Sequence, residues 1–393
     1  MNDLKTFRKE RLARHIATLP KSGIREFFEL ANNMTDVISL GVGEPDFVTP
    51  KLIRQAAIDS LEQGRTSYTS NLGLYSLRKE ICKYLEKDYG CYYRPDDECL
   101  VTVGVSEAFD LAIRAITNPG DEIIYFEPCF VSYNVEIKMA HGIPVASQTS
   151  EENEFSVDIE DVKKKITPKT KAIILNFPCN PTGGTLNLAQ MQAIAELAIE
   201  HDLIVITDEI YSELTYEGQL PSIASLPGMK ERCILLHGFS KAFAMTGFRI
   251  GYACGPIDII GTMMKIHQYA IMSAPTLAQY AAEEALKNGR PEMEKMRETY
   301  RQRRDLMVQG MNDAGLHCFM PKGAFYTFPS IKSTGLSSKD FAMKFLEQHK
   351  VAVIPGTAFG ACGEGYVRCC YATSTENIQE ALRRMKIFVK SLK

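Results

Sequence analysis

Short apolar runs alternate with amphipathic stretches through the middle of the chain. Each apolar run is bounded by polar or glycine-containing residues, which is typical of a buried strand. The predicted strands lie at residues 99–103, 122–126, 172–177, 203–207, 233–236 and 249–254, and helical patterns separate them at 104–116, 133–139 and 188–201. This order predicts an α/β fold in which a mostly parallel sheet is covered by helices on both faces.

The pattern changes at both ends of the chain. Residues 3–19 predict a helix or arm that lies on another surface, followed by a short helix at 24–31 and a strand at 37–40. Helices are expected from Pro50 to about 63, with Thr49 as the N-cap, and from 74 to 89. After a long helical region from 276 to 314, interrupted at 289–291, strands are predicted at 323–328, 351–354 and 366–371, with helices at 338–349 and at the end.

These patterns predict two domains. A large α/β domain is expected over residues 44–290. A smaller α+β domain is expected to combine residues 1–43, which include an N-terminal arm, with residues 291–393.

Composition narrows the class of protein. The 393 residues are 45% hydrophobic and 24% charged, which is ordinary for a soluble globular protein, and the net charge of −3 gives no electrostatic case for nucleic acid or an anionic membrane. No signal-peptide core and no apolar run of transmembrane length is present. The eleven cysteines form no C-x-x-C pair, which favours reduced thiols in a cytoplasmic protein, and the seven histidines show no zinc spacing, so no metal is expected.

One lysine and one arginine stand close together at predicted strand ends. Lys241 follows the run 233–236 on a glycine- and serine-containing turn, and Arg249 opens the next apolar run. Sites in α/β proteins gather at such strand ends. A lysine there can form an imine with a carbonyl compound, and an arginine can bind a phosphate through two parallel hydrogen bonds. The pair therefore predicts a site for pyridoxal 5′-phosphate (PLP), which needs both functions.

Three further motifs follow predicted strands in the α/β part. The run Gly104-Val105-Ser106 begins a helix. Its free backbone N–H groups can bind an anion, or the run is only the N-cap of the helix. The rigid turn Asn180-Pro181-Thr182-Gly183 aims Asn180 in one direction, although such a turn needs no function to explain it. Asp208 ends an apolar strand, where a cation would relieve its desolvation, and Tyr211 follows; a helix cap and a core tyrosine explain the two equally well.

A fourth motif lies in the predicted small domain. Arg368 stands within the apolar run 366–371, where an unpaired guanidinium is costly. Its partner is either a substrate carboxylate or a structural aspartate.

The wording S-K-A-F-A-M-T-G-F-R-I-G-Y around Lys241, together with N-P-T-G at Asn180, resembles the class I and II aminotransferases of fold type I, the aspartate aminotransferase superfamily. The resemblance covers nearly the whole chain from about residue 37. It implies that Lys241 holds PLP as an imine and moves the substrate proton. It also implies that Asp208 keeps the pyridine nitrogen protonated, that Asn180 and Tyr211 bond the 3′-oxygen, and that Phe130 stacks on the ring.

The resemblance also implies where the phosphate and the substrate bind. It assigns the phosphate to residues at the start of the 104–116 helix and around the lysine turn, namely Gly104, Val105, Ser106, Ser240 and Arg249. It further implies that Tyr68 reaches the phosphate of a partner subunit, so that a homodimer shares its active sites. It implies that Arg368 and the Gly43 backbone bind the substrate α-carboxylate, and that Asn180 is also a substrate-binding residue.

The expected activity is therefore amino-group exchange between an L-amino acid and a 2-oxo acid, in two stages. Departures from the family pattern are Phe130 in place of tryptophan or tyrosine, His237 in place of asparagine, and two cysteines after Arg368. A PLP-dependent β-eliminating lyase on the same fold shares nearly all of these residues. A PLP-binding regulator on this fold would need a DNA-binding domain before residue 44, and too few residues precede that position. A catalytically inactive scaffold is the remaining alternative, and the complete set of catalytic residues argues against it. No second arginine can be assigned to a distal carboxylate, so aspartate and aromatic substrates both stay open.

Overall fold

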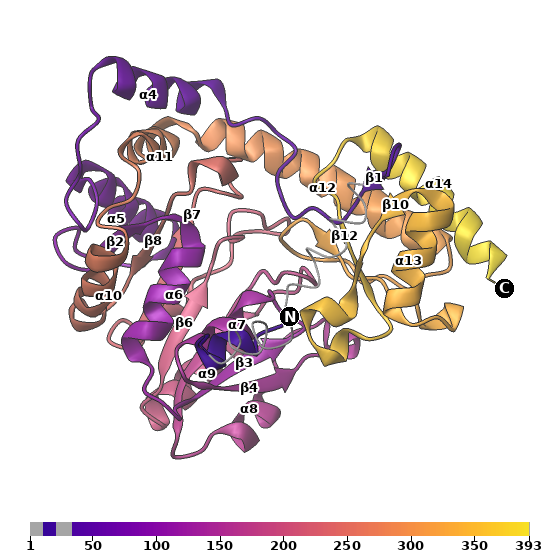
Figure 1. Cartoon of the computed structure of the whole chain (residues 1–393), viewed down its shortest axis with the longest axis horizontal. Coiled ribbons are helices and arrows are strands. Elements are labelled where there is room, and N and C mark those ends of the chain that lie inside the picture. Colours follow the sequence, from indigo (N-terminus) through magenta and orange to yellow (C-terminus); the bar gives the residue numbers. More distant parts are fainter. Residues whose placement is uncertain (1–10, 21–33, 393) are drawn as a thin grey trace.

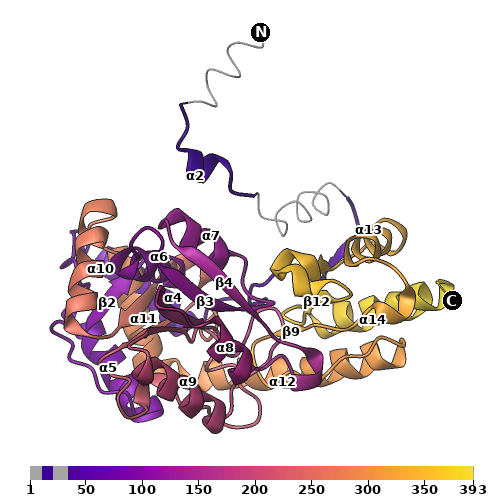
Figure 2. The same cartoon turned by 90° about the horizontal axis from the view of Figure 1, so that it is seen from below.

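The structure is a computed structural model that describes residues 11–20 and 34–392. The helix predicted at 24–31 lies outside the described residues. Within the predicted arm, α2 (Arg14–Ala17) lies beside α7 (Ser132–Met139), and Figure 2 shows it standing off the body of the molecule. Leu12 and Ile16 of the described part of the arm are exposed.

A seven-stranded sheet forms the centre of the larger part of the molecule (Figure 1). Its order is β2-β8-β7-β6-β5-β3-β4, and β8 runs antiparallel to both of its neighbours while the other pairs are parallel. The strands are β2 (Cys99–Thr102), β3 (Glu122–Glu127), β4 (Ile143–Gln148), β5 (Thr170–Leu175), β6 (Ile204–Asp208), β7 (Cys233–Gly238) and β8 (Gly251–Cys254). The prediction of an α/β fold with a mostly parallel sheet is confirmed.

Two hydrophobic clusters cover the two faces of this sheet, because successive side chains of a strand point to opposite faces. In β5, for example, Ala172 and Ile174 belong to one cluster, and Ile173 and Leu175 to the other. The first cluster is completed by α6 (Gly104–Ile116), α7 and α10 (Ile257–Ala270). The second is completed by helices that include α5 (Tyr75–Tyr89), α8 (Ile159–Lys165), α9 (Leu188–Glu200) and α11 (Thr276–Asn288), and α4 (Lys51–Glu62) packs on α11.

The smaller part gathers the segments on either side of this unit. Helix α12 (Arg290–Asp313) leads into it, so the predicted break between two helices at 289–291 is confirmed. Beyond it come the antiparallel sheet β11-β12-β9 and the parallel pair β1-β10, with two covering helices; these elements are β1 (Ile38–Ser39), β9 (Tyr326–Thr327), β10 (Val351–Ala352), β11 (Ile354–Pro355), β12 (Val367–Cys370), α13 (Ser338–His349) and α14 (Thr375–Ser391). The domain boundary at residues 290 and 291 stays a prediction.

One local prediction was wrong, and β4 and the helices α8 and α10 were missed. Pro50, not Thr49, is the N-cap of α4, because the Thr49 hydroxyl instead donates to the carbonyl of Ala244 at 2.5 Å. Strand β4 was not predicted at all. It is an edge strand, largely half-buried, with a proline and polar residues, so it lacks the apolar run that marked the inner strands. Within residues 11–20 and 34–392, no helix is both long enough and apolar enough to cross a membrane.

Candidate active site

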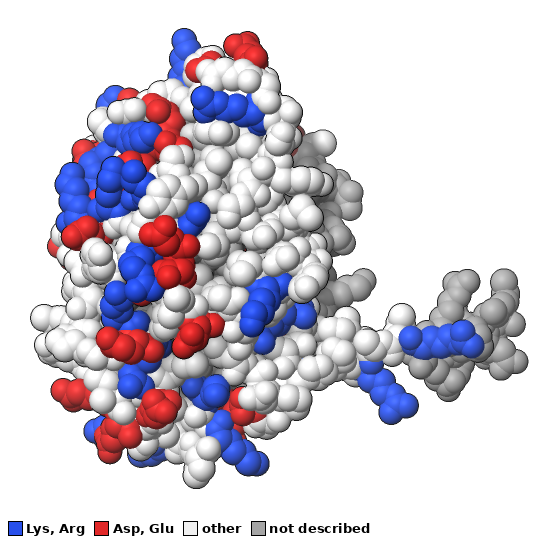
Figure 3. Space-filling view, turned by 90° about the vertical axis from the view of Figure 1, so that its left-hand side faces the viewer, with Lys and Arg blue, Asp and Glu red and all other residues white. Residues whose placement is uncertain are grey.

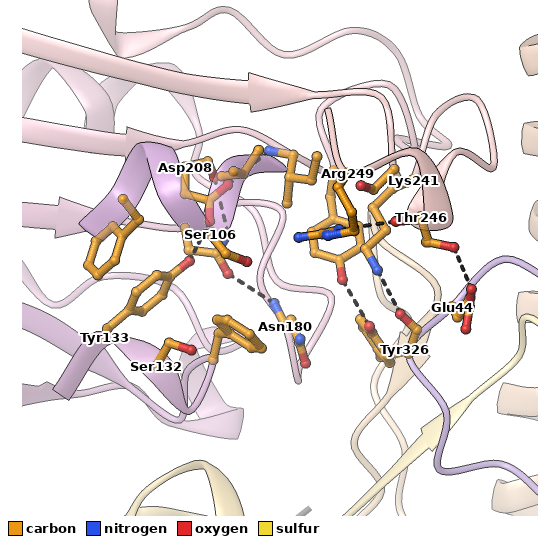
Figure 4. Close-up of a pocket in the computed structure, with 18 of the residues that line it drawn as sticks. Glu44, Ser106, Ser132, Tyr133, Asn180, Asp208, Lys241, Thr246, Arg249 and Tyr326 are labelled. Atoms are coloured by element: carbon orange, nitrogen blue, oxygen red, sulfur yellow. Dashed lines mark hydrogen bonds between the residues drawn. The ribbon is translucent and has the colours of Figure 1, made fainter. Parts of the chain in front are cut away.

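A cavity of about 450 Å³ opens where β3, β5, β6 and β7 end. Figure 4 shows side chains from several of these strand ends pointing into it, and the lining includes Gly43, Tyr326 and Arg368 from segments outside the seven-stranded sheet. Most of the predicted site residues line this one cavity: Gly43, Val105, Ser106, Phe130, Asn180, Asp208, Tyr211, Ser240, Lys241, Arg249 and Arg368. The sequence therefore predicted where the site is assembled, although the role of each residue stays a prediction.

Lys241 stands on the turn after β7 with its amine in the cavity. Its Nζ donates to the carbonyl of Gly43 at 2.7 Å (Figure 4). The rings of Tyr211 and Phe325 lie 5.9 and 5.7 Å from Nζ. Burial is the largest influence on this amine and lowers its pKa from 10.5 to about 8. At a pKa of about 8, roughly a tenth of the lysine amines are unprotonated at pH 7, and this fraction can act as a nucleophile.

Asp208 is the buried carboxylate of the cavity. One of its oxygens accepts from the hydroxyl of Tyr133 at 2.7 Å, and the other accepts from the backbone N–H of Ile210 at 3.1 Å (Figure 4). Burial raises its pKa from 3.8 to about 6, while these two hydrogen bonds and the charge of Lys241 oppose the rise. The carboxylate is thus mostly ionised at neutral pH and suited to a cation in the cavity.

The start of α6 and Arg249 form an anion-binding corner. Gly104 has φ +76°, and a Cβ built on it would come within 2.7 Å of Arg249 Nη2, so the arginine lies directly over the helix start. The first backbone N–H groups of α6, at Val105 and Ser106, have no partner within the helix. A helix N-terminus beside a guanidinium is a ready site for a phosphate.

Arg368 of β12 is 2% exposed and tightly held. Its Nη1 donates to Asn180 Oδ1 at 2.9 Å and its Nη2 to the carbonyl of Gly41 at 2.6 Å. The rings of Tyr326 and Phe359 lie 4.5 and 4.7 Å from the guanidinium carbon, and Nε has no hydrogen-bond partner among the described residues. Among the described residues no carboxylate bonds this cation, so no structural aspartate pairs with it there.

Two aromatic groups complete the lining. The hydroxyl of Tyr211 shares a 2.8 Å hydrogen bond with the hydroxyl of Tyr326, and burial raises the pKa of Tyr211 well above its usual value. Phe130 packs edge-on against Tyr133, with ring centroids 5.8 Å apart. Both predicted aromatic residues therefore face the cavity, each backed by a second ring that the sequence analysis did not single out.

Two predicted residues stand differently from the rest. Tyr68 is 80% exposed and lies outside the cavity. Its loop is tied to the start of α11 by a hydrogen bond from Thr276 to Ser67, and to the residues before α11 by one from Asn71 to Met272, both 2.8 Å. Gly43 does line the cavity, but its carbonyl accepts from Lys241 and, as an acceptor, cannot bond a carboxylate. Only the N–H of Gly43 can serve the predicted role.

Among the lining side chains that sequence reasoning missed are Tyr133, Glu136 and Tyr326. Tyr133 and Glu136 follow Phe130 by three and six residues, so helical spacing from Phe130 was the available signal for both. Burial raises the pKa of Glu136 to about 8, and its Oε2 lacks a partner among the described residues. This carboxyl is therefore largely neutral at pH 7 and adds little negative charge beside Asp208.

Comparisons with known proteins agree with this geometry. The family described as aminotransferase class I and II matches residues 35–385. The Pyrococcus abyssi protein named aspartate aminotransferase is 46% identical over 375 residues, which are 95% of this chain and 96% of that protein. The protein named aromatic-amino-acid aminotransferase 2 of Thermococcus litoralis is 42% identical over 375 residues, again 95% of this chain and 96% of the relative.

A solved structure is also closely similar. The structure of an aromatic aminotransferase from Pyrococcus horikoshii has a TM-score of 0.89 and 45% identity, and it covers 94% of this chain and 99% of its own. These findings support an aminotransferase and not the lyase alternative. The chain belongs to the class I and II aminotransferase family.

Proposed function

We propose that this protein is a PLP-dependent aminotransferase that exchanges an amino group between an L-amino acid and a 2-oxo acid in two stages. One observation carries the proposal: a single cavity brings the Lys241 amine, the Asp208 carboxylate and the anion-binding corner at Arg249 together. An amine for an aldehyde, a carboxylate for a pyridinium and a cradle for a phosphate match three of the polar groups of PLP.

The cavity has the size and chemistry for this cofactor. A volume of about 450 Å³ lies within the range of small-molecule sites. Gly104 carries no side chain where a Cβ would collide with Arg249, so the phosphate corner depends on that glycine. Phe130 supplies an aromatic face for a ring, and the Asn180 amide can donate to the 3′-oxygen because Arg368 already binds its Oδ1.

Bound PLP supplies an electron sink for the electron pair left when the substrate Cα–H bond breaks. In this proposal, Asp208 stabilises the protonated ring nitrogen through its charge, and Tyr133 keeps Asp208 ionised. With the cofactor bound, Lys241 Nζ would be the group that moves the proton between the substrate Cα and C4′. Its pKa of about 8 allows the amine both to accept and to give up that proton near neutral pH.

Arg368 is the proposed holder of the substrate α-carboxylate. It is buried and carries a donor without a partner among the described residues, and a carboxylate can accept from its planar fork in two places. The two named relatives differ in substrate, one named for aspartate and the other for aromatic amino acids. We therefore place the substrates of this chain among aspartate, aromatic amino acids and their 2-oxo acids.

A homodimer with shared sites is part of the proposal. Figure 3 shows the side of the molecule that carries α4, α5 and α10, where charges of both signs are interspersed and a broad area is uncharged. Several large apolar side chains near the Tyr68 loop and α10 are exposed, namely Tyr68, Tyr269, Ile271 and Met272. Exposed apolar groups of this kind favour a protein interface.

The eleven free cysteines, all but Cys362 buried, support a reducing compartment, and we place the reaction in the cytoplasm.

The test is a half-reaction with the PLP-loaded protein and no 2-oxo acid. A panel containing aspartate, phenylalanine, tyrosine, alanine and cysteine is added one at a time, and cofactor absorbance, released 2-oxo acid and released ammonia are measured. The proposal predicts one 2-oxo acid per site, conversion of the cofactor to its amine form, and recovery when a different 2-oxo acid is added. Ammonia released over many turnovers with the cofactor unchanged would instead identify a lyase. Lys241→Ala is the matched control and should give neither result.

A further inference from the structure

Residues 41–49, here called the crossing segment, link β1 in the smaller part of the molecule to α4 in the larger part (Figure 1). The segment contacts two of the three cations of the cavity. The carbonyl of Gly41 accepts from Arg368 Nη2 at 2.6 Å, and the carbonyl of Gly43 accepts from Lys241 Nζ at 2.7 Å. The positions of these two carbonyls therefore influence where both cations point.

The two ends of the crossing segment are fixed by hydrogen bonds. At its start, the backbone of Leu40 accepts from Cys370 at 2.7 Å and donates to Ala352 at 2.8 Å. At its end, Thr49 donates to the carbonyl of Ala244, three residues after Lys241. The stretch between these anchors contains no regular secondary structure. Its course must therefore be set by side chains.

Thr246 donates to Glu44 of the segment, and a further side-chain anchor comes from Arg303 of α12. Its Nη1 lies 2.9 Å from Asp46 Oδ1, and the side chains of Arg303 and Asp46 are 9% and 26% exposed. The guanidinium carbon also lies 5.3 Å from the ring centre of Phe47 and 5.9 Å from that of Tyr300, and these two rings meet edge-on at 5.4 Å. A buried arginine is costly without a counter-charge, so the pair ties the middle of the segment to α12.

We infer that Arg303 is a positioning residue of the active site. Acting through Asp46, it holds the crossing segment on α12 so that the carbonyls of Gly41 and Gly43 keep Arg368 and Lys241 aimed into the cavity. The inference rests on the proposed function for the roles of those two cations. Catalysis is sensitive to such positioning, since a displacement of about 1 Å costs on the order of 100-fold in rate.

The test compares the wild-type holoenzyme with Arg303→Met, which removes the charge and keeps a long side chain. Hydrogen–deuterium exchange of peptides covering residues 41–49 is measured with kcat and KM for the best amino acid found in the half-reaction. Exchange should become faster in that segment, KM should rise, and kcat/KM should fall by roughly 10- to 100-fold, because Arg368 and Lys241 both lose their aim. Arg303→Lys keeps the charge but not the fork, and it should recover part of both effects.

Arg304 provides a matched control on the same helix. It is 6% exposed, but it donates to the carbonyl of Pro321 and to Glu217, away from the crossing segment. Arg304→Met should lose stability while leaving both the exchange of residues 41–49 and KM at wild-type values.

An active wild type whose Arg303→Met variant shows unchanged exchange or unchanged KM would overturn the inference. Equal effects of Arg303→Met and Arg304→Met on KM would also overturn it, because they would indicate a purely structural role. A wild type that transaminates no amino acid is a different result: it would refute the proposed function, and with it the catalytic meaning of this anchor.

Discussion

The hydroxyl of Tyr133 donates a 2.7 Å hydrogen bond to Oδ2 of Asp208. Tyr133 lies on α7, far from β6 in sequence, so the tertiary fold alone brings the donor to the carboxylate. This bond opposes the effect of burial, which raises the pKa of Asp208 to about 6. The ionised state that we propose for Asp208 therefore depends on a residue with no predicted role.

Tyr133→Phe tests this dependence. Without the donor, the pKa of Asp208 should rise further, because the bond favours the charged form. Fewer sites then hold the carboxylate that pairs with the ring nitrogen as the pH falls. The pH below which PLP affinity is lost should move upward by about one to two units, as expected for one hydrogen bond to a charged group.

PLP dissociation constants measured from pH 5 to 8 check this prediction. Asp208→Asn is the control and should bind weakly with little dependence on pH in this range. Superimposable profiles for the wild type and Tyr133→Phe would show that the hydrogen bond does not control Asp208.

His237 predicts a pH dependence of stability. It is 2% exposed, its ring stacks on Tyr252 and contacts the Ser212 hydroxyl at 2.8 Å, and burial lowers its pKa to about 4. The unfolded chain has a histidine pKa near 6.5. Between pH 6.5 and 4 the unfolded state binds a proton that the folded state refuses, so stability is fully present above 6.5 and is lost as the pH falls through this window.

His237→Asn should remove this part of the acid sensitivity. Urea unfolding at pH 7.5 and at pH 4.5 gives the free energy that each protein loses on acidification. The wild type should lose more than the variant, by on the order of 2 kcal/mol. Other titrating groups contribute to both proteins and cancel in the comparison. An equal loss in the two proteins would contradict the buried neutral histidine.

Arg368→Lys tests the proposed carboxylate site. The planar fork contacts Asn180 and Gly41 at once, and lysine cannot reproduce that geometry. For every amino acid substrate, kcat/KM should fall by roughly 10- to 100-fold, equivalent to one hydrogen bond between charged groups. PLP affinity, measured by titration, should stay close to that of the wild type. Loss of cofactor affinity with substrate affinity retained would assign Arg368 to the cofactor or to the fold.

The exposed position of Tyr68 leads to a complementation experiment. Tyr68→Ala and Lys241→Ala subunits should each be nearly inactive as homodimers. In a mixed dimer, one site keeps Lys241 and receives an intact Tyr68 from its partner, while the other site lacks both. Random mixing makes roughly half of the dimers mixed, so about a quarter of wild-type activity should return.

Subunit exchange is confirmed separately with tagged subunits. If exchange is complete and activity stays at the level of the two single variants, Tyr68 acts within its own chain or not at all. The shared-site arrangement would then be wrong.

The inner part of the fold could be predicted because its signals are local. Strands such as β6 are continuous apolar runs, and α6 and α13 begin at Gly104 and Ser338, where the sequence analysis placed them. The sequence analysis missed the edge strand β4, because a half-exposed strand does not need an apolar run. Thr49 was misassigned because its hydroxyl bonds a residue 195 positions away, and tertiary contacts of that kind leave no mark in a local pattern.

The residues of the site also differ in whether a local pattern in the sequence identifies them. Lys241, Asn180 and Asp208 follow strands or sit on rigid turns, so their positions could be inferred from sequence. Tyr133 and Arg303 act through partners that are distant in the chain, and on helices they resemble ordinary packed or solvated residues. Their contributions become visible only in the folded chain.

The central claim is that Lys241 carries PLP, and one measurement tests it most directly. The PLP-loaded protein is treated with borohydride, which reduces the bond between the lysine nitrogen and the cofactor aldehyde carbon to a stable secondary amine, and it is then digested and mapped by mass spectrometry. The structure places the Lys241 amine in the cavity with a pKa lowered to about 8, so the pyridoxyl label should fall on Lys241, at about one label per chain. A label on any other lysine, or no label on a protein that still transaminates, would contradict the account.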